Sequence, residues 1–182
     1  MPTSFYRHFG DMDELGLAVV DQLGLDLRRL MRGADAAGVE PAQVVREGVA
    51  AYQRYVLDNA ELVEFVNQAR TGGTPPLRQA IGNELESFGI RVASAVREVV
   101  PGLKAAEADT VAQVVLAVLL ESAGPLLDLA AKSEDLRDEA REALEARLTV
   151  ILLGAQQLAS AGSPPAAAAK RKPRARPAGG PR

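Results

Sequence analysis

The chain has 182 residues, 47% of them apolar, enough for one compact hydrophobic core with appended segments. It has no cysteine and one histidine, His8, which excludes disulfides, thiolate metal sites and a two-histidine metal site within one chain. No secretory signal pattern is visible, and Glu121 ends the most apolar run, 111–120, too soon for it to cross a bilayer. We therefore expect a cytoplasmic protein with no membrane partner, no metal and no cofactor.

Charge is divided unevenly along the chain. The whole sequence carries 21 basic and 24 acidic residues, but the stretch 163–182 holds basic residues and no acidic one, so the remainder is strongly acidic. An acidic body does not attract nucleic acid through its bulk charge, so any contact with DNA must be local.

In chain order, three amphipathic helices are predicted before residue 71. Each has apolar residues at spacings of three and four, the period of a helix with one inward face. The first begins at Asp11 or Asp13 and ends near Arg32; the second begins at Pro41; the third is short and capped by Asn59. The expected inward residues are Leu15, Val19, Leu23, Leu27 and Leu30, then Val45, Val49, Tyr52 and Val56, then Leu62, Val66 and Ala69.

Three longer helices follow a predicted loop at 71–74. The first runs from Pro75 to the Pro101-Gly102 break, and the second, from about 106 to 132, is apolar on nearly all sides and should be deeply buried and kinked at Pro125. Ser133 or Asp135 caps the last helix. The expected inward residues are Leu77, Ile81, Leu85, Phe88, Val92, Val96 and Val99, and then Ala140, Leu144, Leu148, Ile151, Ala155 and Leu158. No stretch alternates as a strand does, so the fold class is all-α.

The stretch 162–182 is expected to be a disordered basic tail, because proline, alanine and arginine in this proportion bury no apolar core. Its run 173–177 is similar to the core of AT-hook peptides, which place arginines in narrow minor grooves, but alanine replaces the usual glycine. The alternative, which we favour, is a solvated tail that binds phosphates without reading sequence. The candidate residues are Lys170, Arg171, Lys172, Arg174 and Arg176.

The first seventeen residues carry the most specific pattern. They predict a short helix, a break at Gly10-Asp11 and then a long helix. Thr3 and Ser4 place small polar groups and free backbone N–H donors at the start of the short helix, where they suit base edges and phosphates. Three further hydrogen-bond donors follow, namely Tyr6, Arg7 and His8, while Phe5 and Phe9 anchor the helix to a core.

The Tyr6-Arg7-His8-Phe9 stretch, followed directly by a long helix, resembles the end of the helix-turn-helix in TetR-family repressors. The longer match over residues 2–17 is similar to the FabR-like branch, whose members repress unsaturated fatty acid synthesis and respond to acyl thioesters. The resemblance implies that Pro2, Thr3 and Ser4 approach bases and that Tyr6 and His8 contact phosphates. Many family members place a phosphate-binding lysine near the position that Met12 occupies here.

The same resemblance implies a division of the chain into four parts. Residues 1–10 are the recognition-helix remnant of a helix-turn-helix head, 11–33 the linker helix, 34–161 a ligand-binding and dimerisation domain, and 162–182 the tail. It also implies operator DNA as a partner, a small apolar effector such as a fatty acyl thioester, and a homodimer through the last two helices. Small residues are expected to open a ligand pocket (Gly82, Gly89, Ala93, Ala95) and to line the dimer contact (Ala112, Ala117, Ser122, Ala123, Gly124, Gly154, Ala155).

Two hypotheses remain open from the sequence. The first is a ligand-responsive DNA-binding regulator, most simply a repressor of lipid-metabolism genes. The second is a dimeric helical ligand-sensing module without specific DNA binding, because two helices that precede the recognition helix in the family have no counterpart in this sequence. An enzyme is not expected, since no phosphate loop, nucleophile elbow or metal cluster is present.

Overall fold

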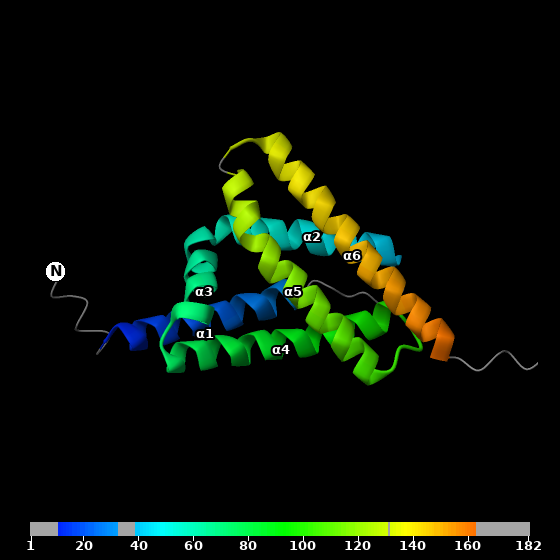
Figure 1. Cartoon of the computed structure of the whole chain (residues 1–182), viewed down its shortest axis with the longest axis horizontal. Helices are drawn as coiled ribbons and strands as arrows, with labels where there is room; N and C mark the ends of the chain where they lie inside the picture. Colours follow the sequence, from blue (N-terminus) through cyan, green and yellow to red (C-terminus); the bar gives the residue numbers. More distant parts are fainter. Residues whose placement is uncertain (1–10, 33–38, 131, 163–182) are drawn as a thin grey trace, which may run out of the picture.

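The computed structural model describes residues 11–32, 39–130 and 132–162. These residues form six helices and no strand: α1 (Met12–Arg32), α2 (Pro41–Asp58), α3 (Ala60–Gly72), α4 (Pro75–Val99), α5 (Ala105–Ala130) and α6 (Glu134–Gly162) (Figure 1). The expectation of an all-α fold is confirmed for the described part of the chain. The stretch 1–10 and the tail 163–182 lie outside the described residues.

Local sequence signals explain where most helices begin. The Oδ1 of Asp11 accepts a hydrogen bond from the backbone N–H of Glu14 at 2.8 Å, so Asp11 is the cap of α1. Of the two candidates for α6, Ser133 is the cap, because its Oγ accepts the N–H of Leu136 at 3.2 Å. Pro41 opens α2, where a missing backbone N–H is tolerated. After α4, Gly102 adopts a φ of 91°, which a side chain would disfavour.

One predicted boundary is confirmed and one is wrong in detail. Asn59 is the N-cap residue of α3, as predicted, but its side chain makes no capping bond there; its Nδ2 instead donates to the backbone oxygen of Tyr55, near the end of α2, at 2.8 Å. The predicted loop at 71–74 is shorter, because α3 continues to Gly72 and α4 begins at Pro75. Where two helices are joined by a tight turn, the end of one and the start of the next share only a few residues. Capping preferences then do not separate the two boundaries.

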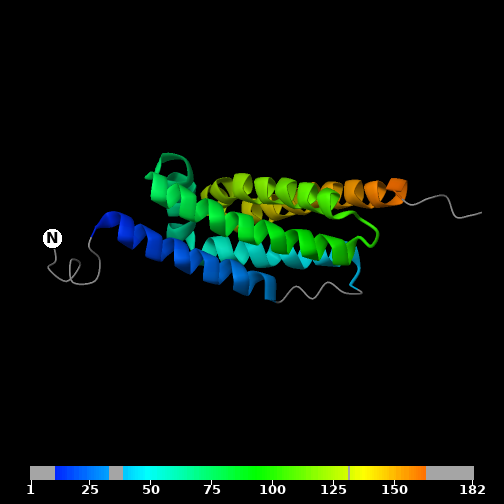
Figure 2. The same ribbon diagram turned by 90° about the horizontal axis from the view of Figure 1, so that it is seen from below.

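The helices are stacked in layers, as seen in Figure 2. α5 and α6 lie side by side along one face of the body, α1 lies on the opposite face, and α2 and α4 lie between them. The short helix α3 packs on α4 and α5 near the end of the body at which α1 begins. This arrangement places α1 and the α5–α6 pair on opposite sides of a common interior.

The interior holds the predicted apolar stripes, with some corrections. Val20, Val49, Val56 and Ile81 are almost completely buried. On α1 the buried positions are Gly16, Val20, Leu23 and Gly24, whereas the predicted Leu15 and Val19 are only half-buried. The pattern was misread because α1 approaches α4 at two glycines: a Cβ at position 16 would press on Leu77, and one at position 24 would overlap the carboxylate of Glu84. A glycine can therefore mark a buried face that a search for apolar side chains misses.

The expectation for α5 was wrong in a way that bears on function. Within the described chain only 22% of the most apolar 18-residue window in Ala105–Leu129 is buried, and Val114 is exposed. By length and composition alone this span, with a mean hydropathy of 1.7, is also long and apolar enough to cross a membrane, contrary to the prediction from the ten-residue run. α5 lies on the outer layer, so one side of an almost wholly apolar helix faces away from its own domain. The prediction for α6 also failed at one position, where Ala159 is buried and Leu158 is exposed.

Candidate ligand cavity and outer helix face

A large cavity lies among α1, α2, α4, α5 and α6. Its volume is about 840 Å³, within the range of roughly 300–1,000 Å³ that is typical of small-molecule sites. The wall is mostly aliphatic and aromatic, with contributions from every helix around it: Leu30 and Met31 of α1, Val45 and Tyr52 of α2, Phe88 and Val92 of α4, Leu119 of α5, and Leu148 and Ile151 of α6. Such a wall favours an apolar ligand because it offers few partners for buried polar groups.

Several small residues of α2 line this space. Gly48, Ala50 and Ala51 face the cavity, where larger side chains would fill it. Of the four small residues predicted to open a pocket, only Ala95 lines the cavity. Gly82 is exposed, Gly89 is only half-buried, and Ala93 packs in the core between α4 and α5. Sequence reasoning missed Gly48, Ala50 and Ala51, three small residues that lie close together among the valines of α2 and line the cavity.

A second, smaller cavity of about 60 Å³ adjoins the first. Both cavities are lined by Leu30, Tyr52, Phe88 and Leu119, so these side chains form a shared wall. The smaller cavity extends towards α3 and reaches Tyr55. We call the larger space the outer chamber and the smaller one the inner chamber.

Two tyrosines one turn apart on α2, together with Asn67 of α3, provide the polar groups in the lining of the inner chamber. The hydroxyl of Tyr52 donates to the backbone oxygen of Leu119 at 2.5 Å. Burial raises the pKa of Tyr52 to about 12, a shift that its hydrogen bond with Ser122 partly opposes. Burial also raises the pKa of Tyr55 to about 12, and the negative charge of Asp26 adds to this shift. Both phenols keep their protons well above neutral pH, but only the hydroxyl of Tyr52 donates a hydrogen bond within the described chain.

Charged side chains lie at the rim of the larger cavity and not in its interior. Arg29, Glu47, Arg54 and Asp58 contribute to its lining, and all four are exposed. Arg29 is paired with Asp26 at 2.9 Å. The border thus carries charges of both signs, which does not select an anionic or a cationic ligand by itself.

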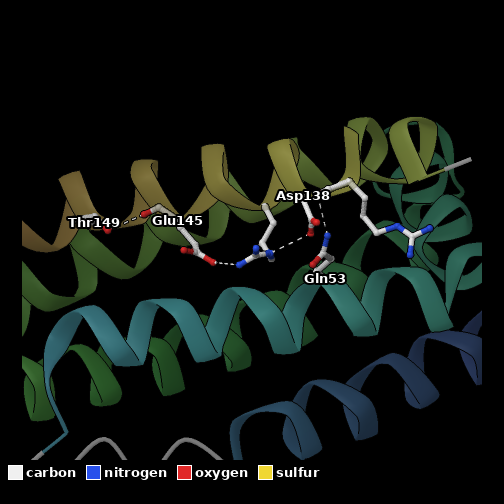
Figure 3. Close-up of polar contacts among 6 residues, drawn as sticks. Gln53, Asp138, Glu145 and Thr149 are labelled. Carbon is white, nitrogen blue, oxygen red and sulfur yellow. Dashed lines mark hydrogen bonds and ion pairs between the residues drawn. The ribbon is translucent and has the colours of Figure 1, made fainter. Parts of the chain in front are cut away.

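A polar seam between α2 and α6 holds one wall of the cavity in place (Figure 3). The buried Gln53 of α2 donates through its Nε2 to the backbone oxygen of Arg137 on α6 at 3.1 Å. Further along α6, Arg141 lies between two carboxylates, 2.8 Å from Glu145 and 3.6 Å from Asp138. A buried amide that is satisfied across two helices favours one register of α2 on α6.

α1 connects the cavity to the start of the chain. Its last turn supplies Leu30 and Met31 to the cavity wall. Further towards its N-terminus it is fixed to α4 by the ion pair between Arg28 and Glu84, whose NH1 and Oε2 atoms are 3.2 Å apart. Met12, at the opposite end of the helix, is exposed. One 21-residue helix therefore has its last turn in the cavity wall and its first turn at Met12.

The outer face of α5 and α6 carries several large apolar side chains in the open. Val150 and Leu153 are 68% and 58% exposed. We call the α5–α6 face the exposed set Val114, Ala117, Val150, Leu153, Gly154 and Leu158. The small residues predicted for a dimer contact are divided: Ala117 and Gly154 belong to this face, Ser122 and Gly124 are half-buried, and Ala112, Ala123 and Ala155 are buried within their own chain.

The predicted DNA-contacting residues cannot be placed, because Pro2, Thr3, Ser4, Tyr6, Arg7 and His8, like the basic tail residues, lie outside the described residues. Within the part of the chain that the structure describes, no group of three His, Asp or Glu side chains is placed to hold a metal ion. No known protein-family model matches the chain. The TetR resemblance therefore stays a prediction that depends on residues 2–17.

Proposed function

We propose that the chain is a TetR-type transcriptional regulator, most simply a repressor of lipid-metabolism genes, whose helical body senses a small apolar ligand. One observation carries the proposal: a large apolar cavity is lined by the last turn of α1, the helix that directly follows the Tyr6-Arg7-His8-Phe9 stretch. In this proposal α1 links the ligand cavity to the segment that resembles a recognition helix.

In this proposal, DNA contact falls to the first residues of the chain. Thr3 and Ser4 approach base edges with Pro2, while Tyr6, Arg7 and His8 hold phosphates. The acidic body contributes nothing to this attraction, so the contact depends on these few groups and on the tail. A dimer doubles the contact, and the spacing between its two copies determines which half-site separation it fits.

A second copy of the chain is the proposed occupant of the α5–α6 face. α5 is apolar almost all round yet mostly unburied, and Val150 and Leu153 of α6 extend the apolar surface. Two copies that pair these helices would cover both surfaces around a two-fold axis. Lipid is a less suitable cover, because the exposed Glu121 lies inside the apolar span, and a carboxylate is unfavourable in hydrocarbon.

The effector in this proposal is an elongated apolar molecule, with a fatty acyl thioester as the example that the resemblance supplies. Its acyl part would occupy the aliphatic cavity. Ligand between α1, α2 and α4 would shift α1 relative to α4, and so change the spacing of the two DNA-contacting segments in a dimer. The ligand acts either way, for or against DNA binding, according to which spacing fits the operator.

The alternative function is a dimeric ligand sensor without specific DNA binding. In this alternative the chain binds a ligand in the cavity and dimerises through the α5–α6 face, but residues 1–10 do not recognise a DNA sequence. A test that separates the two functions is fluorescence anisotropy of the chain with a duplex from its own upstream promoter and with a scrambled duplex, across a salt series. Preference for the promoter duplex that persists at moderate salt supports the regulator. Equal, weak binding with a steep salt dependence supports the alternative and assigns DNA contact to the tail.

A further inference from the structure

The hydroxyl of Tyr55 is a hydrogen-bonding group without a bond. Its oxygen is buried, yet it contacts no acceptor or donor among the described residues. A buried hydroxyl that loses its bonds with water and gains none in return destabilises the fold by about 1–3 kcal/mol. Groups of this kind are rare in folded proteins, and a bound ligand is one partner that can satisfy them.

Two neighbouring polar side chains have partners within the protein, and Asn67 also lines the chamber. Tyr52 donates to Leu119, as described above. Asp26, the carboxylate whose charge influences Tyr55, instead accepts hydrogen bonds from Gln22 Nε2 at 2.8 Å and Arg29 NH1 at 2.9 Å. Tyr55 is thus an unbonded donor near the charge of Asp26, in the wall of a small chamber, and its oxygen is closed off from solvent, so a ligand reaches it only when neighbouring side chains move.

We propose that Tyr55 is a ligand-recognition residue, which donates a hydrogen bond to an uncharged acceptor, such as a carbonyl oxygen, on an otherwise apolar ligand. This inference rests on the proposed function, because the ligand must occupy the large cavity. The inner chamber, about 60 Å³, has room for a small polar group, and it shares the side chains of Leu30 and Phe88 with the larger cavity, so a ligand in that cavity would have to displace one of them to reach Tyr55.

The geometry also selects the charge of the acceptor. A carboxylate in the inner chamber would be desolvated and would lie near Asp26, so both burial and like charge oppose it. A hydrocarbon would leave the Tyr55 hydroxyl unbonded. An uncharged acceptor satisfies the hydroxyl without burying a second charge, so it is the class that the site prefers over both.

The test uses three matched probes and the full chain. The probes are a long-chain methyl ketone, the alkane in which a methylene group replaces its carbonyl group, and the carboxylate of the same chain length. Dissociation constants come from displacement of an environment-sensitive fluorescent dye. Wild type is expected to bind the ketone about three- to tenfold more tightly than the hydrocarbon, and the carboxylate least tightly. In Tyr55→Phe the ketone loses this advantage, while affinity for the hydrocarbon is unchanged.

Ile90→Ala is the control, because Ile90 is 66% exposed on α4 and lines neither cavity. That variant is expected to keep the preference for the ketone, and Tyr55→Phe is expected to keep wild-type stability or gain some. A ketone preference that survives in Tyr55→Phe, or a carboxylate that binds most tightly, overturns the inference alone. If no probe binds wild type, the cavity is not a ligand site, and the proposed function fails together with the inference.

Discussion

Ile81 and Ile90 lie on the same helix, α4, and show how burial decides what a side chain contributes. Ile81 is 1% exposed and packs with Val20 and Leu77, while Ile90 is 66% exposed. We expect Ile81→Ala to lower the free energy of unfolding by about 2–5 kcal/mol, because it loses apolar burial and leaves a cavity. Ile90→Ala, the control, should change it by less than about 0.5 kcal/mol. Urea unfolding followed by circular dichroism measures both, and equal losses would contradict the placement of α4.

The buried tyrosines predict how stability responds to alkaline pH. The pKa of Tyr52 is about 12 in the folded protein, against 10.0 for an unperturbed phenol. The folded state therefore holds the proton more tightly than the unfolded state, so this contribution is complete below pH 10 and is lost as the pH rises from 10 to 12. Urea midpoints between pH 9 and 12 should fall less steeply for Tyr52→Phe than for wild type. Parallel slopes would show that Tyr52 ionises as an exposed phenol does.

At the scale of helices, the contact between α1 and α4 depends on the absence of a side chain at Gly24. A methyl group there would displace the carboxylate of Glu84 and break its ion pair with Arg28. Gly82 on α4 is the matched control, since a Cβ there would contact nothing. Gly82→Ala should raise the free energy of unfolding by about 0.5–1 kcal/mol through helix propensity. The free energy of unfolding of Gly24→Ala should be about 1 kcal/mol lower than that of Gly82→Ala. Thermal unfolding distinguishes them, and equal stabilisation would mean that α1 and α4 are further apart than described.

The helices themselves were largely predictable from sequence, because the signals that begin them are local. Asp11, Pro41, Pro75 and Ser133 each act within one turn of their own helix. The faces were less predictable. Gly24 is buried because α4 approaches α1 there, and this approach depends on residues far away in the chain.

The cavity and the burial of α5 escaped prediction for related reasons. Ala51 and its small neighbours on α2 line a cavity only because the helices around them stay apart, a property of the whole packing arrangement. The apolar composition of α5 indicated that the helix needs cover, but composition does not say whether the cover comes from its own chain. Predicted contacts of residues 2–8 with DNA stay predictions, since they lie outside the described residues.

At the scale of the whole molecule, the α5–α6 face predicts a dimer. Leu153→Arg should raise the dissociation constant of the dimer about tenfold or more, because a charge would be buried between two apolar surfaces. Ile90→Arg places the same charge on an exposed site of α4, away from that face, and should leave the dimer intact. Sedimentation velocity across a range of concentrations measures both variants. If Leu153→Arg still forms dimers, the interface lies elsewhere on the molecule. If the wild-type protein is a monomer, the proposed interface does not exist.

The central claim is that ligand in the cavity controls DNA binding through α1, and one measurement tests it most directly. The dissociation constant for the promoter duplex is measured by anisotropy with and without saturating long-chain methyl ketone, in wild type and in Ala51→Trp, which fills the cavity. The account predicts a change of about fivefold or more in wild type, in either direction, and no change in Ala51→Trp. A wild-type protein that is saturated with the ketone and still binds the duplex with unaltered affinity would contradict the account.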